Sequence, residues 1–394
     1  MQSLFFAVYE SLLETSEGIT RLLVPSNSLT EKVPPRSPAF FNPNARLNRD
    51  LSMVAYKAYA RESNNRTMAD SLAGVGARSV RAAVEVKELE EVYINDANPI
   101  AIDMAKQSSR LNGVEGRCKF SINEVCKFLI EHSSKGSRFG IVDLDPFGTP
   151  APYIDCALRA VSDEGLFSVT ATDTPVLCGI YPDVCVRRYY GKPLNTEYGN
   201  EVGLRLILGL ISMIASRLEL GIKPLFVHST RNYLRVYVIV KVGSQRADDM
   251  PSKLGYIYHC FSCNSRSYSN GNNAQQMCDK CKKSMKTAGH LWIDSIFDSA
   301  FVDNMLRALD DCTVDKKCGK LLSMVINEVN LPPSYFSVDE LAETLKVTPP
   351  AISAIIDKLK DSGFVASRTS LKMTGFKTNA SYDEVLEALR AIVA

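Results

Sequence analysis

Apolar and polar positions follow two recurring patterns along residues 66–198. Short apolar runs are typical of strands buried inside a sheet, and longer segments with an apolar residue every three or four positions are typical of covering helices. The short runs predict strands at 67–72, 92–96, 117–122, 139–144 and 165–170. The segments between them predict helices at 77–86, 98–112, 124–132 and 151–161. This alternation predicts an α/β fold whose parallel sheet is covered on both faces.

Two further patterns flank these alternating strand and helix segments. Before them we expect a strand at 17–25, a loop with three prolines at 26–38 and a helix at 44–61. After them, a long apolar helix at 199–220 precedes two strands at 224–228 and 234–242, which we expect to pair antiparallel.

The C-terminal part is predicted to be largely helical. Two helices fill 301–329, and Ser337 with Glu340 has the spacing of a capping box, which predicts a helix at 338–345. A second helix at 351–360, a short strand at 364–368 and a tail helix at 382–393 follow. Helix, turn, helix and strand in this order suggest a winged-helix-like module at 331–380, with recognition and packing as alternative roles.

Composition adds general bounds. The chain has 394 residues, 45% of them apolar and 23% charged, and a net charge of +2, so a polyanionic partner must be met by local patches. No uninterrupted apolar run of membrane-spanning length and no secretory signal are found, so we expect no membrane segment. Seven of the eleven cysteines stand singly, which suggests buried thiols in a reducing compartment: Cys118, Cys126, Cys156, Cys178, Cys185, Cys312 and Cys318.

The strand predicted at 139–144 runs into an acidic turn, Asp145-Pro146-Phe147. Ligands of open α/β sheets bind at the carboxyl ends of the strands, where Asp145 is expected. The Asp145 carboxylate and the Pro146 carbonyl would be two adjacent acceptors suited to an exocyclic NH2 group. The alternative is an Asp-Pro turn that caps the next helix.

Two neighbouring aromatic residues, Phe40 and Phe41, precede the helix at 44–61. They either pack under the loop or present one ring to a base or a cofactor.

A small-residue turn after the first strand is a candidate cofactor site. It runs from Asp70 to Gly76 through Gly74, and Ser79 stands where a dinucleotide-binding turn would have its third glycine. Asp96 follows Gly76 by 20 residues, the spacing at which an acid accepts both hydroxyls of a ribose. Together these features indicate a nucleoside without a pyrophosphate, such as S-adenosylmethionine. Asp96 has an alternative role as the N-cap of the next helix.

Four cysteines form the most specific local pattern. The pairs Cys260/Cys263 and Cys278/Cys281 are separated by 14 residues, which predicts a closed, structural Zn²⁺ site in a zinc ribbon at 255–290. His259 is a possible substitute ligand. Six cations stand near the ribbon against Asp279, an excess that suits a phosphate backbone: Lys253, Arg266, Lys280, Lys282, Lys283 and Lys286.

Three other features stay open. The loop around Asp173 is either an Asx turn or part of a site, and Trp292 is expected to pack the ribbon onto the main domain. The segment from Arg187 to Lys192 mixes cations with tyrosines, which suits phosphate contact and stacking or, alternatively, a solvated charged turn.

These residues together resemble the tRNA guanine-26 N2-dimethyltransferase family. The most specific motifs are DLDPFGTP at 143–150 and RRYYGKPLNTEYGNEVGLR at 187–205. The others are FFNPNARLNRDLS at 40–52, DSLAGVGARSVR at 70–81, VYINDANP at 92–99, TATDTPVLCG at 170–179, HSTRNYLRVYV at 228–238, GYIYHCFSC at 255–263, AGHLWI at 288–293 and GFKTNA at 375–380.

The resemblance implies a Rossmann-like class I methyltransferase fold with a C-terminal α+β domain. Its parts would be a lead-in that contacts cofactor and substrate at 1–65, the methyltransferase domain at 66–245 and a tRNA-binding domain at 246–394. The cofactor would be S-adenosylmethionine and the partner tRNA, and we expect a monomer. The expected location is intracellular, in the nucleus or cytoplasm, with the mitochondrion as a further possibility.

The resemblance also assigns residues. Besides Asp70 and Gly74, the cofactor positions would be Arg49, Arg78, Asp96, Asn123 and Glu124. The family usually has an acid where Asn123 stands. The catalytic group would be Asp145, Pro146, Phe147 and Phe40, with Asp145 and the Pro146 carbonyl accepting the N–H groups of guanine N2 and the rings sandwiching the base.

Two competing functions are considered. One is an amino-methyltransferase that acts on DNA or protein, and the other is a non-catalytic RNA-binding protein.

Overall fold

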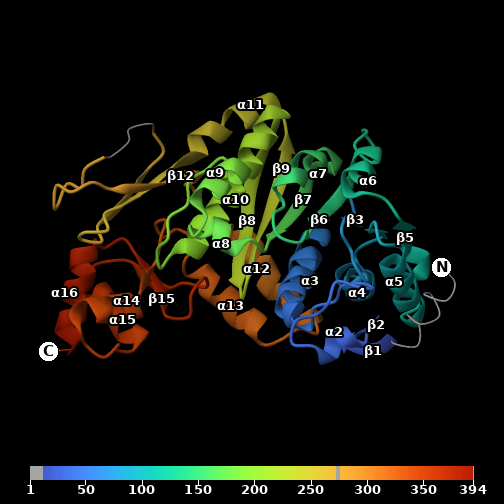
Figure 1. The fold of residues 1–394 in the computed structure, drawn as a ribbon, viewed down its shortest axis with the longest axis horizontal. Coiled ribbons are helices and arrows are strands. Elements are labelled where there is room, and N and C mark those ends of the chain that lie inside the picture. The colour runs from blue at the N-terminus through green and yellow to red at the C-terminus, as the bar shows by residue number, and fades with distance from the viewer. Residues whose placement is uncertain (1–11, 272–275, 394) are drawn as a thin grey trace. The chain divides into compact units, whose positions relative to one another are not determined.

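The computed structural model describes residues 12–271 and 276–393 (Figure 1). The chain divides into two compact units. Of the described residues, the first contains those up to 170 together with 238–241 and 303–320, and the second contains those in 171–237, 242–302 and 321–393.

A seven-stranded sheet organises the fold. Its order is β5-β4-β3-β6-β7-β9-β8. The first five strands of this sheet along the chain are parallel: β3 (Thr67–Asp70), β4 (Glu91–Asn95), β5 (Cys118–Ser121), β6 (Phe139–Leu144) and β7 (Val161–Ala171). The chain steps outward from β3 to β5 and then returns to the other side of β3 at β6. The strand order therefore reverses between β3 and β6, which is where ligands bind in open α/β sheets.

The strands and helices predicted for this region are confirmed within a few residues. Its helices are α3 (Arg46–Ala60), α4 (Ala77–Glu85), α5 (Pro99–Leu111), α6 (Val125–Glu131) and α7 (Ile154–Ala160), with short 3-10 turns at Pro43–Ala45, Glu115–Arg117 and Ala151–Tyr153. The N-terminal segment differs from expectation. β1 (Leu12–Glu17) and β2 (Thr20–Pro25) form an antiparallel hairpin, and the expected loop contains a short helix, α2 (Asn27–Thr30).

A buried ionic network joins the hairpin to α3 and α4, which lie side by side in Figure 1. The fully buried Arg81 pairs with Glu17 at 3.2 Å, with Asp50 at 2.7 Å and with Glu85 at 2.8 Å. Burial opposes ionisation of Glu17, yet the neighbouring Arg49 and Arg81 guanidinium groups lower its pKa. The network holds the hairpin against the two helices that border the β3 turn.

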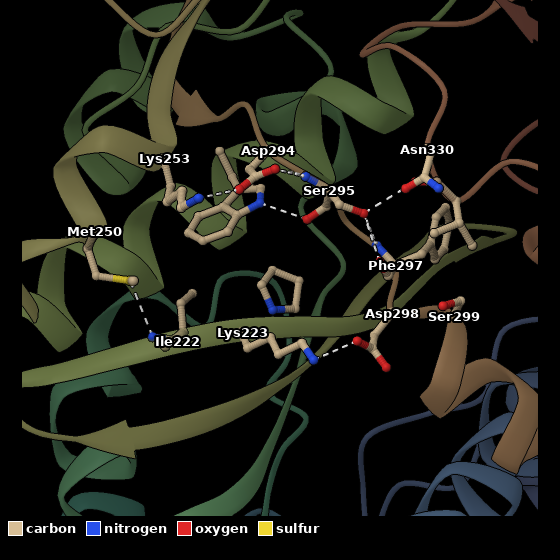
Figure 2. Close-up of a pocket in the computed structure, with 13 residues that line it drawn as sticks. Ile222, Lys223, Met250, Lys253, Asp294, Ser295, Phe297, Asp298, Ser299 and Asn330 are labelled. Atoms are coloured by element: carbon tan, nitrogen blue, oxygen red, sulfur yellow. Dashed lines mark hydrogen bonds and ion pairs between the residues drawn. The ribbon is translucent and has the colours of Figure 1, made fainter. Parts of the chain in front are cut away.

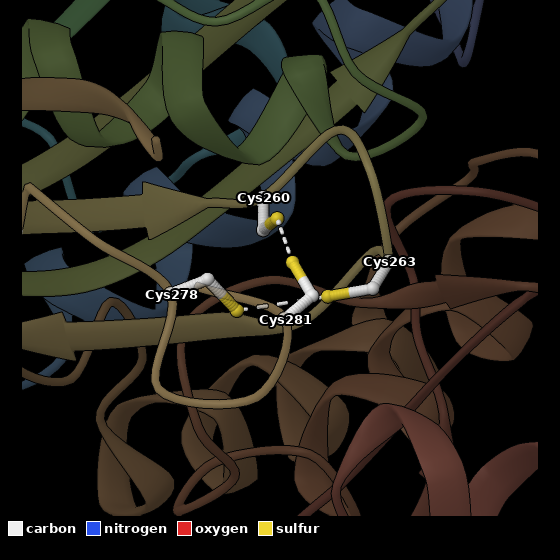
Figure 3. A group of neighbouring side chains, drawn as sticks. All are labelled: Cys260, Cys263, Cys278 and Cys281. Atoms are coloured by element: carbon white, nitrogen blue, oxygen red, sulfur yellow. Dashed lines mark hydrogen bonds between the residues drawn. The ribbon is translucent and has the colours of Figure 1, made fainter. Parts of the chain in front are cut away.

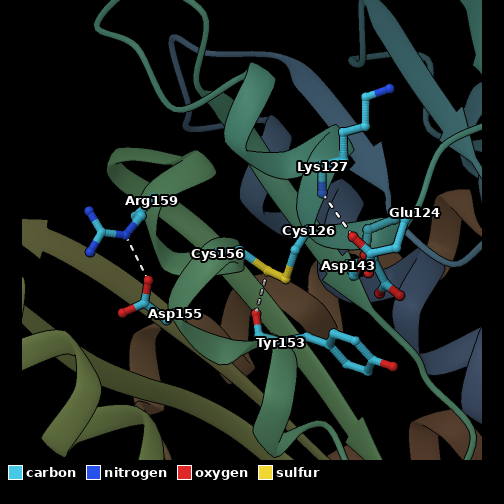
Figure 4. The surroundings of a disulfide bond; sticks show 9 residues. Glu124, Cys126, Lys127, Asp143, Tyr153, Asp155, Cys156 and Arg159 are labelled. Atoms are coloured by element: carbon cyan, nitrogen blue, oxygen red, sulfur yellow. Dashed lines mark hydrogen bonds and ion pairs between the residues drawn. A yellow bond between two sulfur atoms is a disulfide. The ribbon is translucent and has the colours of Figure 1, made fainter.

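The first unit contains a disulfide, which corrects the expectation of free thiols at two positions. Cys126 in α6 is bonded to Cys156 in α7 (Figure 4). The two cysteines lie 30 residues apart in sequence, with their Cα atoms 5.4 Å apart. The other singly placed cysteines are free thiols, and burial raises the pKa of Cys118 to about 11.

The second unit is built around one long helix. The elements between residues 171 and 253 are α8 (Thr174–Leu177), α9 (Pro182–Tyr189), α10 (Gly199–Arg217), β8 (Leu220–Thr230), β9 (Tyr233–Val242), α11 (Ser244–Asp248) and a 3-10 turn at Met250–Lys253. Residues 238–241 of β9 belong to the first unit. By length and composition, α10 is the one helix among the described residues that could cross a membrane, and 78% of that apolar window is buried inside the protein. It therefore packs as a core helix.

The ribbon and the C-terminal module follow. The ribbon is a three-stranded sheet in the order β11-β10-β12, made of β10 (Leu254–His259), β11 (Arg266–Ser269) and β12 (Lys286–Trp292). The remaining elements are α12 (Ser299–Ala308), a 3-10 turn at Leu309–Asp311, α13 (Lys317–Ile326), β13 (Phe336–Ser337), α14 (Val338–Leu345), α15 (Ile352–Asp361), β14 (Ala366–Arg368), β15 (Gly375–Thr378) and α16 (Tyr382–Val393).

The module has the predicted order of helix, turn, helix and strand around its own apolar core, which includes Leu341, Ile355, Leu359 and Phe376. The capping box expected at its start is wrong in detail. Among the described residues, the Ser337 side chain makes no capping hydrogen bond, and burial raises the pKa of Glu340.

Candidate active site

Three carboxylates gather where the strand order reverses. Asp70 ends β3, Asp143 is paired with it in register on β6, and Asp145 follows β6. Arg78, in the first turn of α4, reaches two of them. Its Nη2 lies 2.5 Å from Asp145 Oδ2, and its Nε lies 3.5 Å from Asp143 Oδ1. Arg78 is therefore the positive centre of an otherwise acidic cluster.

Helix α3 supplies two further partners of Arg78. Its Nη2 also donates to Asn48 Oδ1 at 3.0 Å, and its Nη1 donates to the Ser52 hydroxyl. Arg78 is only 6% exposed, so its guanidinium is held from several sides. The Asp145 carboxylate, 27% exposed, thus projects from a fixed support toward solvent.

Asp143 is the hidden part of this support. It is fully buried, and its Oδ2 accepts hydrogen bonds from the hydroxyls of Tyr56 and Ser168, the latter at 2.8 Å. The sequence analysis did not single out Asp143, Tyr56 or Ser168. The signal available for Asp143 was its two-residue spacing from Asp145, because alternate residues of a strand share one face.

Asp70 is a buried carboxylate of the cluster with a raised pKa. It is 2% exposed, and burial, helped by the nearby negative charge of Asp143, raises its pKa to about 7. Arg78 counteracts this shift. The cluster therefore gains or loses a proton near neutral pH.

The glycine turn lies beside this cluster and is closed by Asp96. Gly74 and Gly76 have φ angles of +53° and +77°, in the left-handed region that glycine adopts freely. Asp96 Oδ2 accepts the Gly74 N–H at 2.8 Å, and its Oδ1 accepts the Asn98 N–H at 2.9 Å. Asn98, not Asp96, is the N-cap of α5, so the alternative role considered for Asp96 is wrong.

Two aromatic residues predicted for the site, Phe40 and Phe147, contact each other near this turn. The rings of Phe40 and Phe147 lie edge to face with centroids 4.7 Å apart, and the Phe147 ring is 55% exposed. A Cβ added to Gly74 would lie 3.2 Å from the Phe40 carbonyl oxygen, which places the main chain of Phe40 next to the glycine turn. Phe41 is instead buried, 5.0 Å from the Arg49 guanidinium. Of Phe40 and Phe41, Phe41 is therefore packed in the interior, and Phe40 is partly exposed.

The other predicted site residues have partners of their own. Arg49 is buried, pairs with Glu17 and donates to the Asn42 carbonyl at 2.9 Å. The main chain of Asn123 bonds to the Asn95 side chain. The exposed Glu124 accepts the Lys127 N–H at 3.0 Å and caps α6. Pro146 is buried next to Asp145. The structure thus brings Asp70, Gly74, Arg78, Asp96, Asp145, Phe147 and Phe40 into one region of the first unit.

The four predicted metal ligands also come together. Their Sγ atoms lie within 4.8 Å of one another, with 3.4 Å between Cys260 and Cys281 and 3.6 Å between Cys263 and Cys278 (Figure 3). A tetrahedral ion with Zn–S bonds of about 2.3 Å requires sulfur separations of roughly 3.8 Å, so the arrangement fits Zn²⁺. His259 is not needed, since its Nδ1 lies 3.0 Å from the Tyr198 hydroxyl.

The positive charge expected around the ribbon is partly neutralised, which corrects that expectation. Arg266 lies against the rings of Tyr198 and Phe336 and donates to the Tyr335 carbonyl. Lys253 pairs with Asp294 and Lys280 with Asp383. The exposed remainder is Lys282, Lys283 and Lys286.

A cavity of about 360 Å³ lies in the second unit, and Figure 2 shows residues that line it. Its charged side chains pair with one another, Lys253 with Asp294 at 2.7 Å and Lys223 with Asp298 at 2.6 Å. The buried Trp292, expected to anchor the ribbon, lines it and donates its indole N–H to the Ser295 carbonyl at 2.9 Å. The cavity offers no charge that a ligand must satisfy, and we assign it no function.

Comparison with known proteins supplies the remaining evidence. Residues 18–390 match the model of a family described as N2,N2-dimethylguanosine tRNA methyltransferase. A tRNA (guanine(26)-N(2))-dimethyltransferase from Methanothermobacter thermautotrophicus is 35% identical over 97% of this chain and 100% of its own length. An Aquifex aeolicus enzyme, named as a tRNA (guanine(26)-N(2)/guanine(27)-N(2))-dimethyltransferase, is 30% identical over 95% of each chain.

Among solved structures, the complex of Trm1 from Pyrococcus horikoshii with S-adenosyl-L-methionine is similar throughout. It is 29% identical, has a TM-score of 0.83, and covers 96% of this chain and 99% of that chain.

Proposed function

The chain belongs to the N2,N2-dimethylguanosine tRNA methyltransferase family and has its class I methyltransferase fold, and we propose that it dimethylates N2 of guanine 26 in tRNA. The observation that carries the proposal is the solvent-facing Asp145 carboxylate, held by Arg78 beside the glycine turn. Family membership favours tRNA over the DNA and protein acceptors considered as alternatives, and an enzyme over a non-catalytic RNA-binding protein.

The residues around the glycine turn fit S-adenosylmethionine, the ligand of the similar solved structure. We propose that the turn at Gly74 and Gly76 holds the cofactor, with Asp96 facing the ribose and Asp70 and Arg78 near the amino acid part. Arg49, Asn123 and Glu124 remain proposals from the family pattern. When bound, the cofactor supplies an electrophilic methyl group on a sulfonium.

The acceptor nitrogen needs help from the protein. The lone pair of guanine N2 is delocalised into the ring, so the amine is a poor nucleophile. We propose that Asp145 and the Pro146 carbonyl accept its two N–H bonds and turn the lone pair out of the ring plane. Arg78 positions the carboxylate, and most of the rate then comes from positioning and local electrostatics.

The aromatic pair would receive the base. A guanine stacked within folded RNA must first be extruded, at a cost of a few kcal/mol. Phe40 and Phe147 contact each other, so a base that enters between them replaces one ring contact with two. Asp145 or solvent takes the proton that the nitrogen loses. In the second methylation only one N–H remains, and one acceptor is enough.

The wider assignments follow from the same proposal. Residues 1–65 would contact cofactor and substrate, 66–245 would carry out methyl transfer, and 246–394, with its four-cysteine zinc ribbon, would bind tRNA. We propose an intracellular, monomeric enzyme. Location in the nucleus or mitochondrion stays a prediction from the resemblance.

Substitution of Asp145 tests the catalytic assignment. Asp145→Ala is expected to slow methyl transfer to unmodified tRNA about 10²- to 10⁴-fold, the usual contribution of a positioned acid or base. Its dissociation constant for S-adenosylmethionine, measured by calorimetry, should change less than about threefold, since Arg78 keeps three other partners. Glu131→Ala, which removes an exposed carboxylate at the end of α6 in the same unit, is the control. Near-normal turnover by Asp145→Ala would show that the assigned role is wrong.

A further inference from the structure

The segment that contains α9 has a buried face which anchors it. Cys185 and Tyr189 are fully buried. The Tyr189 hydroxyl donates to Asp173 Oδ1 at 2.7 Å, and Arg188 Nη1 lies 3.1 Å from Asp173 Oδ2. Asp173, left open by the sequence, is therefore the acid that fixes this helix.

Several other side chains of the segment are apolar or aromatic and exposed. Ile180 is 59% exposed, Tyr181 55%, Val186 45% and Tyr190 69%. Val186 and Tyr190 are four residues apart and so lie on one side of the helix. We call this surface the α9 face, defined by Ile180, Tyr181, Val186, Arg187, Tyr190 and Lys192.

Tyr190 is held in place although its ring is exposed. It ends α9 with a φ of 53°, a left-handed conformation in which helix ends usually carry glycine. The next residues are fixed, because a Cβ on Gly191 would lie 2.4 Å from the His290 carbonyl, and Lys192 N–H donates to the Gly289 carbonyl at 2.6 Å. Glycine would adopt this backbone conformation without steric cost. The presence of tyrosine is therefore best explained by a role of its ring.

The chemistry of the α9 face favours one class of partner. Two exposed cations, Arg187 and Lys192, lie in the same segment as the exposed tyrosines, against one exposed acid, Asp183. Aromatic rings beside cations are what proteins use to bind unstacked nucleotides, since the rings stack on bases and the cations meet phosphates.

We propose that the α9 face binds unpaired or unstacked nucleotides of the RNA substrate. Tyr190 and Tyr181 stack on bases, and Arg187 and Lys192 contact the phosphates. This inference rests on the proposed function, because extrusion of a guanine deprives its neighbours of a stacking partner and leaves base faces for a protein ring to cover.

The test compares the affinity of full-length variants for unmodified tRNA, measured by fluorescence anisotropy at fixed salt. Tyr190→Gly removes the ring and suits the backbone, so its melting temperature should equal or exceed that of the wild type. Its tRNA dissociation constant should rise about 5- to 100-fold, the range for loss of one base–aromatic stack. Tyr190→Phe should bind within about twofold of the wild type.

Glu219→Gly is the matched control. Glu219 is an exposed residue of the same unit with a φ of 57°, so glycine relieves the same conformation there without removing a ring. It should leave tRNA affinity unchanged.

Wild-type affinity in Tyr190→Gly would overturn the inference, as would an equal loss in Tyr190→Phe. Unchanged tRNA affinity together with altered oligomeric state would overturn it in favour of a protein interface. Absence of tRNA methylation by the wild type would instead contradict the proposed function, so the two failures are distinguishable.

Discussion

Removal of the disulfide between Cys126 and Cys156 should destabilise the first unit by a calculable amount. The bridge closes a loop with a sequence separation of 30 residues. The chain-entropy model assigns such a loop about 3.6 kcal/mol of stabilisation, through restriction of the unfolded chain. For a unit of this size, that corresponds to a fall in melting temperature of about 7–14 °C.

The test replaces both Cys126 and Cys156 by alanine and compares the stability of this double variant with that of the wild type by denaturant and thermal unfolding. The buried free thiol Cys118 offers the control, because Cys118→Ala removes a sulfur without removing a bridge. Treatment with a dithiol reductant should lower the stability of the wild type and leave that of the double variant unchanged.

The bridge also lies between two segments that contain proposed site residues. It joins α6, which follows Asn123 and Glu124, to α7, which follows the turn at Asp145 (Figure 4). Free thiols at both positions by mass spectrometry after alkylation, or equal unfolding curves with and without reductant, would refute the reasoning.

Two further predictions concern the metal and the acidic cluster. Cys278→Ser should reduce bound zinc from one equivalent to nearly none by elemental analysis and weaken tRNA binding, while affinity for S-adenosylmethionine stays within about twofold; undiminished zinc content would contradict the four-thiolate site. Asp70 has a folded-state pKa of about 7, above its ordinary 3.8, so its stabilising contribution is complete below pH 4 and is lost as pH rises through 7. Relative to Asp70→Asn, the free energy of unfolding of the wild type should therefore fall with rising pH in that window, by up to about 1.4 kcal/mol per pH unit, and parallel pH profiles would show that Asp70 does not titrate there.

The strands of the sheet and the position of Asp145 can be predicted from the sequence, because both depend on local sequence patterns. Apolar runs locate β3 to β7, and the turn after β6 places Asp145 at a strand end whatever the details of packing. The two C-x-x-C pairs likewise carry their ligand set within one short segment.

What the sequence missed depends on contacts between distant residues. The bond between Cys126 and Cys156 requires α6 and α7 to lie together, and nothing in either helix indicates this. The hydrogen bonds of Asp143 come from Tyr56 and Ser168, which are distant from it in sequence. The sequence predicts that Arg266 contributes to a surface charge, whereas the rings of Tyr198 and Phe336 lie against it.

The most direct test of the central claim is the identity of the methylated nucleoside. Unmodified tRNA would be incubated with the protein and S-adenosylmethionine, digested, and examined by mass spectrometry, with a tRNA that carries adenine at position 26 as control. The account predicts N2-methylguanosine followed by N2,N2-dimethylguanosine at position 26, and next to no product when Asp145 is replaced by alanine. Methylation of a different atom, or dimethylation at the wild-type rate in Asp145→Ala, would contradict it.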